Sequence, residues 1–201
     1  MTGVTIHVID DDADARDSLA FLLSTADLDV VTYETAAAFL AVADTARGCV
    51  ITDIRMPEID GMELVRRLRD RGISLPIVVI TGHGDVPLAV EAMKAGVRDF
   101  IEKPFDDEVI LRAISGALAE ANTDGAREGE RGELLARIES LSTRERQVLD
   151  GLVAGKANKV IARDLDISPR TVEIYRANLM TKMQAESLSV LVRMALTAGI
   201  A

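Results

Sequence analysis

Acidic side chains stand directly after two short apolar runs of this 201-residue chain. Asp10, Asp11 and Asp12 follow one run, and Asp53 follows another. Adjacent carboxylates repel one another, and a hard divalent cation with oxygen ligands relieves that repulsion. Mg²⁺ binds one or two carboxylates, keeps several waters and accepts phosphate oxygens. These aspartates therefore predict a Mg²⁺ site that handles a phosphoryl group.

Two further polar residues suit phosphoryl transfer. Asp53 is the carboxylate left to attack an electrophilic phosphorus, with its negative charge partly offset by the metal. The transfer needs positive charge and hydrogen-bond donors around the phosphoryl oxygens. Lys103 supplies an ammonium group and Thr81 a hydroxyl, and each also follows an apolar run. The bond between Lys103 and Pro104 is one at which a cis peptide is tolerated.

The elements that must position these groups alternate along the first 121 residues. Short apolar runs, expected to be buried strands, alternate with segments whose apolar residues repeat at helical spacing. This alternation predicts an α/β fold, a doubly wound five-stranded parallel sheet with helices on both faces. The expected strands are residues 4–9, 30–33, 49–52, 76–80 and 99–101, and the expected helices are residues 15–26, 35–42, 62–68, 87–95 and 106–120.

The carboxyl ends of parallel strands meet at one edge of the sheet, where α/β proteins place their functional groups. Asp10, Asp53, Thr81 and Lys103 each follow an expected strand, so we expect them to converge there. Each group alone has an ordinary explanation, a helix cap for the first aspartates and a solvated surface position for Lys103. Their shared position after four strands favours a functional site.

Composition limits the classes of protein to which the chain can belong. Hydrophobic residues make up 48% of it, enough for a buried core. No apolar run reaches the roughly 18 residues of a membrane span, and the single cysteine, Cys49, excludes a disulfide framework. We therefore expect a cytoplasmic protein without a membrane partner.

The distribution of charge divides the chain. Residues 1–121 hold 11 Lys and Arg against 22 Asp and Glu, whereas residues 141–201 hold 9 against 6. An acidic first part and a basic second part predict two domains, the second near a polyanion. Between them, residues 122–138 carry glycines among charges and are expected to form a linker.

Four short helices and no strands are expected from Leu141 onward. Thr143 is predicted to cap a helix over residues 144–153, followed by one over residues 157–165. Ser168 and Pro169 suit the N-cap and first position of a third helix that runs to Met183. The face of this helix expected in the core carries Val172, Tyr175, Leu179 and Met183.

The opposite face of the third helix is polar and has small side chains. Such a helix can lie in the major groove of DNA, where Arg and Asn read base edges while flanking basic side chains hold phosphates. A helical pair that only packs is the structural alternative. The predicted DNA-contacting residues are Lys156, Asn158, Lys159, Arg170, Thr171, Glu173, Ile174, Arg176, Ala177, Asn178 and Lys182.

The first 121 residues resemble the receiver domain of two-component response regulators. The matching motifs are Ile9-Asp10-Asp11-Asp12, Thr52-Asp53-Ile54-Arg55-Met56-Pro57, Val79-Ile80-Thr81-Gly82 and Phe100-Ile101-Glu102-Lys103-Pro104-Phe105. The resemblance implies that Asp53 accepts phosphate, with Asp10, Asp11, Asp53 and the Arg55 carbonyl as Mg²⁺ ligands. It further implies that Thr81 and Lys103 bind the phosphoryl group and that Phe100 changes rotamer with Thr81.

Residues 141–201 resemble the LuxR-type helix-turn-helix domain, which we expect to span residues 139–201. The resemblance rests on Leu141-Ser142-Thr143-Arg144-Glu145, Gly155-Lys156-Ala157-Asn158-Lys159 and Ser168-Pro169-Arg170-Thr171-Val172. The whole chain is thus similar to transcriptional response regulators of the NarL/FixJ class, and Tyr175-Arg176-Ala177-Asn178 favours the FixJ side of that class. The class implies a sensor histidine kinase, double-stranded promoter DNA and RNA polymerase as partners. It also implies a homodimer formed on phosphorylation, for which Val90 and Lys94 are candidate contacts because the helical pattern exposes them.

Two alternatives remain at this point. A Mg²⁺-dependent phosphatase of the haloacid-dehalogenase type also places acids after its first strand, with Asp10 or Asp12 as nucleophile, but it has no use for residues 141–201. A constitutive DNA-binding protein whose receiver is no longer phosphorylated is the other. The complete set of acidic, hydroxyl and lysine groups favours the regulator, which would be no enzyme beyond slow self-dephosphorylation.

Overall fold

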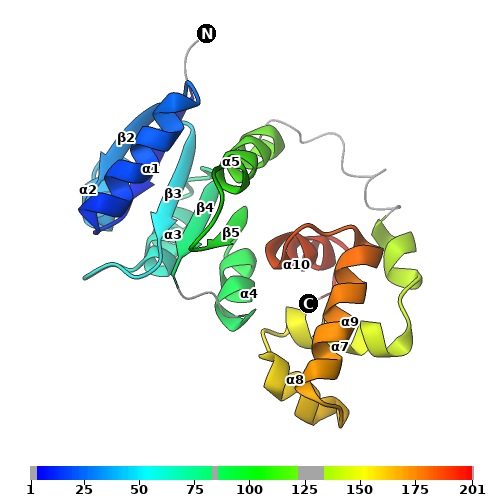
Figure 1. Cartoon of the computed structure of the whole chain (residues 1–201). Coiled ribbons are helices and arrows are strands. Elements are labelled where there is room, and N and C mark those ends of the chain that lie inside the picture. Colours follow the sequence, from blue (N-terminus) through cyan, green and yellow to red (C-terminus); the bar gives the residue numbers. More distant parts are fainter. Residues whose placement is uncertain (1–3, 83–85, 122–133, 201) are drawn as a thin grey trace. The chain divides into compact units, whose positions relative to one another are not determined.

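The structure is a computed structural model that describes residues 4–82, 86–121 and 134–200 (Figure 1). The chain divides into two compact units, Met1–His83 with Ala95–Thr123, and Gly84–Lys94 with Asp124–Ala201. Within the described ranges, no helix is long and apolar enough to cross a membrane.

The first unit is built on a five-stranded sheet in which all neighbouring strands are parallel, in the order β2-β1-β3-β4-β5. This confirms the predicted parallel sheet. β1, β3 and β4 are interior strands that carry apolar residues on both faces, as strands covered from both sides must. The strands are β1 (Thr5–Ile9), β2 (Asp29–Tyr33), β3 (Cys49–Asp53), β4 (Ile77–Thr81) and β5 (Asp99–Glu102).

Helices α1 (Ala13–Thr25) and α5 (Asp107–Ala121) bury their apolar residues against one set of strand side chains. Ile6, Val8 and Ile51 of the sheet form a cluster with Leu23 of α1 and Ile110 of α5. Because side chains alternate along a strand, the intervening buried residues point to the opposite face. There, α2 (Ala36–Leu40) and α3 (Gly61–Asp70) contact each other and contribute further buried side chains.

Helix α1 begins two residues earlier than the apolar pattern predicts. Asp12 is its N-cap, and the Asp12 carboxylate accepts the backbone N–H groups of Asp14 and Ala15 at 2.9 and 3.1 Å. This cap supplies acceptors for donors that have no partner within the helix. The last of the three consecutive aspartates therefore has a structural role, while Asp10 lies before the helix.

The second unit is entirely helical in its described part. It contains α4 (Val86–Lys94), α7 (Thr143–Val153), α8 (Asn158–Leu165), α9 (Pro169–Met183) and α10 (Leu188–Thr197). Its core confirms the predicted inner face of α9, where Val172, Leu179 and Met183 are fully buried and Tyr175 packs against the same cluster.

Two expectations for this unit are corrected. Leu134 and Ile138 fall in the expected linker but are buried in the helical core, so packing begins before residue 139. Residues 122–133 of that linker lie outside the described residues. The cap of α7 is Ser142 rather than Thr143, because the Ser142 hydroxyl accepts the Glu145 N–H while the Glu145 carboxylate accepts the Ser142 N–H.

Candidate phosphoacceptor site and nucleic-acid interface

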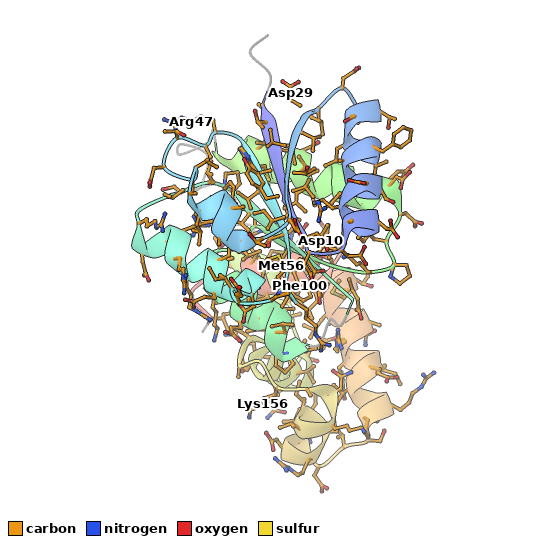
Figure 2. The ribbon with its side chains drawn as sticks, turned by 90° about the vertical axis from the view of Figure 1, so that its left-hand side faces the viewer. Asp10, Asp29, Arg47, Met56, Phe100 and Lys156 are labelled. Carbon is orange, nitrogen blue, oxygen red and sulfur yellow. The ribbon has the colours of Figure 1, made fainter. Side chains whose placement is uncertain are left out.

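Three of the predicted site residues meet at the carboxyl ends of β1, β3 and β5. The Lys103 ammonium lies 3.0 Å from Asp10 Oδ2 and 3.0 Å from Asp53 Oδ1. The carboxylates are almost enclosed, with 10% and 11% of the Asp10 and Asp53 side chains exposed. Figure 2 shows Asp10 and Met56 at the end of the sheet opposite to Asp29, which opens β2. Lys103 thus joins two carboxylates that are 43 residues apart in sequence.

Asp10 is fixed by contacts on both its side chain and its backbone. Its Oδ1 accepts the Asp12 N–H at 3.0 Å, and its backbone carbonyl accepts a hydrogen bond from Arg16 Nη1 at 2.7 Å. Arg16 lies in α1 and reaches back over the loop that carries Asp10 and Asp11. It was not among the predicted site residues, since no spacing rule connects it with a backbone carbonyl six residues earlier.

Asp53 stands at the last position of β3, and its Oδ2 accepts the Arg55 N–H at 2.6 Å. The loop after it must pass close to α3. A Cβ on Gly61, the first residue of α3, would stand 2.3 Å from the Asp53 carbonyl oxygen. Only glycine permits this close approach, so the position of the acceptor loop depends on Gly61.

Thr81 and Phe100 lie on the neighbouring strands β4 and β5, two residues apart in register. Thr81 ends β4 and pairs with Glu102, while Phe100 pairs with Val79 two residues earlier. Opposed residues of paired strands point to the same face, so Thr81 and Phe100 share one side of the sheet as diagonal neighbours. The Thr81 carbonyl also accepts the Lys103 N–H at 2.7 Å, which ties the lysine to the end of β4.

The electrostatics keep Lys103 charged. Partial burial lowers the pKa of the Lys103 ammonium, but its hydrogen bonds and ion pairs with Asp10 and Asp53 outweigh burial and raise the pKa above its ordinary value. The peptide bond from Lys103 to Pro104 is cis.

The residues at this edge fit Mg²⁺. Among the described residues, no three His, Cys, Asp or Glu side chains form a ready metal cage. Mg²⁺ does not require one, because it keeps several waters and binds one or two carboxylates. Asp10 and Asp53 supply two carboxylates, and Asp11, next to Asp10 in the sequence, is exposed. The Lys103 ammonium between Asp10 and Asp53 marks the point at which positive charge is stabilised.

The predicted DNA-contacting residues all lie in, or just before, α8 and α9, and none of them is buried. Several have partners within the unit. Arg176 Nη1 donates to Asn158 Oδ1 at 3.0 Å, Lys156 pairs with Asp164 at 2.8 Å, and Arg170 lies 3.4 Å from Glu173. The contacts of Arg176 and Arg170 hold side chains of α9, and the Arg170 side chain is nevertheless 84% exposed.

Lys182 differs from the other basic residues because its partner is buried. Its Nζ lies 2.7 Å from Glu145 Oε2, and only 5% of the Glu145 side chain is exposed. Lys182 and the hydrogen bonds from Ser142 lower the pKa of the Glu145 carboxyl. Lys182 therefore connects α9 to α7, a structural role that the sequence did not reveal. The sequence did contain the capping box Ser142-x-x-Glu145, but not the lysine that pairs with its glutamate.

The exposure expected for Val90 is wrong for this structure. Val90 is 3% exposed and clusters with Met93 of α4 and Val192 of α10 within the second unit, whereas Lys94 is exposed. The error arises because helical periodicity identifies an apolar residue but not the element that covers it.

Both halves of the chain match known protein families. Residues 6–115 match the family "Response regulator receiver domain", and residues 139–195 match "Bacterial regulatory proteins, luxR family". The transcriptional regulatory protein FixJ of Azorhizobium caulinodans is 58% identical over 99% of this chain and 95% of its own length. FixJ of Rhizobium meliloti is 55% identical over 99% of this chain and 98% of its own.

A solved structure of a relative is also similar. The crystal structure of full-length FixJ from B. japonicum is similar with a TM-score of 0.59 and 52% identity, and covers 100% of both chains. These matches disfavour the phosphatase alternative, and so does Asp12, whose carboxylate is committed to the cap of α1.

Proposed function

Because the chain belongs to the response regulators that join a receiver domain to a LuxR-type DNA-binding domain, we propose that Asp53 is its phosphoryl acceptor. Proteins of this kind regulate transcription through phosphorylation and are not enzymes. The observation that carries the proposal is the bridge from Lys103 to Asp10 and Asp53, which places an ammonium group beside a nearly enclosed carboxylate.

The donor is a phosphohistidine of a sensor kinase. An Asp53 carboxylate oxygen attacks phosphorus, the phosphorus–nitrogen bond breaks, and the imidazole leaves with its electron pair. Lys103 then exchanges its contact with Asp53 for a phosphoryl oxygen, to which the Thr81 hydroxyl also donates. Mg²⁺ held by Asp10, Asp11, Asp53 and the Arg55 carbonyl would neutralise charge on the phosphoryl oxygens. Arg16 keeps the loop of Asp10 in place throughout.

The local change reaches the surface through Phe100. Movement of Thr81 toward the phosphoryl group vacates space on the face that it shares with Phe100, and the ring turns into it. We expect the resulting rearrangement to permit a homodimer with Val90 and Lys94 at its contact. Val90 must leave Val192 for that contact to form, since the two side chains cluster here.

The DNA-binding residues act as two groups in this proposal. Arg170, Glu173, Ile174, Ala177 and Asn178 face the bases from α9, and the remaining predicted residues hold phosphates. A dimer places two copies of α9 about one DNA turn apart on a two-fold symmetric promoter site.

The wider assignments complete the proposal. The receiver spans residues 1–121 and the helix-turn-helix domain residues 139–201. The linker between them ends before Leu134, because Leu134 and Ile138 already pack in the helical core. The protein works in the cytoplasm, where kinase and promoter meet, and contacts RNA polymerase once it is bound to DNA. We expect hydrolysis of its own phosphoaspartate to be slow at most.

Phosphorylation by acetyl phosphate in the presence of Mg²⁺ tests the acceptor. On a phosphate-affinity gel we expect the wild-type chain to shift and Asp53→Asn to remain unshifted. Asp29→Asn, at the other end of the sheet, is the matched control and should shift like the wild type. A shifted Asp53→Asn band would assign the acceptor to another residue, and equal promoter binding with and without acetyl phosphate would refute the switch.

A further inference from the structure

Ile174 is a large apolar side chain that the fold of its own domain does not use. It is 54% exposed in the second turn of α9, whereas Val172 and Leu179 of the same helix are fully buried. Among the described residues of α7 to α10, no other large hydrophobic side chain is exposed to that extent. Its position therefore points to a contact outside the chain.

The neighbours of Ile174 define what that contact can be. Arg170 lies one turn before it and Ala177 one turn after it, so the three share a face of α9. Ala177 is exposed and small, which lets the helix approach a surface closely. Glu173 next to it is exposed and would repel a phosphate, so this face suits base edges better than the DNA backbone.

The polar side chains around Ile174 are already oriented by the protein. Arg170, one turn before Ile174, pairs with Glu173 at 3.4 Å. An apolar side chain next to oriented polar groups is complementary to a partner surface that is mostly polar and carries one apolar group. In the major groove, the C5-methyl of thymine is the apolar group that a base pair presents.

We propose that Ile174 reads the C5-methyl group of a thymine in each half-site of the promoter. The inference rests on the proposed entry of α9 into the major groove. Burial of one methyl group is equivalent to about 0.8 kcal/mol, which is about a fourfold change in affinity for each half-site. Thymine is thereby preferred to cytosine at that position by contact with the methyl, in addition to any hydrogen bond that another residue makes.

Replacing thymine by deoxyuridine removes this methyl and changes nothing else on the base edge. The full-length chain, activated with beryllofluoride and Mg²⁺, first selects its preferred duplexes from a pool with a randomised central segment. The enriched duplex is then made with deoxyuridine at one thymine at a time. We expect one position in each half-site at which wild-type binding weakens about fourfold.

Variants assign the effect to Ile174. Ile174→Ala should bind the thymine and deoxyuridine duplexes equally at that position, and Ile174→Val should show a reduced difference. Leu135→Ala removes another exposed apolar side chain, outside α9, and should keep the full fourfold difference. If Ile174→Ala does not bind measurably, the comparison is made with Ile174→Val.

Three results would overturn the inference. Indifference of the wild type to deoxyuridine at every position excludes methyl recognition while leaving sequence-specific binding intact. A deoxyuridine effect of unchanged size in both Ile174 variants assigns the methyl contact to another residue. A pool in which no sequence is enriched refutes the proposed DNA recognition together with this inference.

Discussion

Substitution of Lys182 by methionine separates two roles for this lysine, a phosphate contact and a structural contact. Met retains most of the aliphatic length and removes the charge, so the Glu145 carboxylate loses its cationic partner at 2.7 Å. That carboxylate has 5% of its side chain exposed and keeps only the hydrogen bonds from Ser142. We therefore expect the substitution to destabilise the helical unit.

The magnitude follows from burial. Removing one partner of a buried ion pair costs about 3–5 kcal/mol. Lys182 is 41% exposed, so solvent already screens its end of the pair, and the Ser142 hydrogen bonds persist. These two facts lower the expected loss of unfolding free energy to about 2 kcal/mol. This loss corresponds to a roughly 30-fold rise in the unfolded fraction of the helical unit.

Lys156→Met is the matched control. Lys156 pairs with Asp164 at 2.8 Å, but 34% of the Asp164 side chain is exposed. The two pairs thus have similar geometry and different burial, and a surface pair contributes about 0.2–1 kcal/mol. We expect Lys156→Met to change the stability much less than Lys182→Met does.

Hydrogen exchange of the full-length protein at several urea concentrations, read out on peptides from α7 and α9, measures both losses. Adding Glu145→Gln to Lys182→Met should recover part of the stability, because the uncompensated buried charge is gone. Equal losses for the two lysine variants would refute the reasoning from burial. The salt dependence of promoter binding provides the second readout, since loss of a phosphate contact lowers its slope by about 1.

Three further predictions concern other parts of the chain. The pKa of Glu145 in the folded chain is below its ordinary value of 4.5. The ionised Glu145 should therefore stabilise the folded chain fully above about pH 4.5, and this contribution should be lost as the pH falls through the lowered pKa of the folded state. Acid unfolding of Glu145→Gln should lack this dependence. Gly61→Ala should cost roughly 1–3 kcal/mol in thermal unfolding and slow phosphorylation of Asp53, because its Cβ would stand 2.3 Å from the Asp53 carbonyl oxygen, whereas Gly116→Ala, with open space around it, should not. Burial raises the pKa of the Cys49 thiol to about 12, so a thiol reagent should leave the folded chain unlabelled at neutral pH and react on unfolding, and labelling at the rate of an exposed thiol would contradict the buried position.

The sequence was sufficient to predict the alternating elements and the edge of the sheet at which Asp53 lies. Its prediction succeeded there because strand and helix differ in hydrophobic period, and because parallel strands bring their carboxyl ends together whatever the loops do. Ser168 and Pro169 marked the start of α9 for an equally local reason, the need for an acceptor and a tolerated proline at a helix start. Properties encoded over a few neighbouring residues could be predicted from those residues.

Only the tertiary structure decided the pairings between distant positions. The contact of Lys182 with Glu145 spans 37 residues, and that of Lys103 with Asp10 spans 93. Burial of Val90 and the hydrogen bond from Arg16 to the Asp10 carbonyl likewise depend on which element lies opposite each side chain. The periodicity of a helix or strand determines which face of that element a residue occupies. The partner of its side chain and its solvent exposure are set by how the elements pack together.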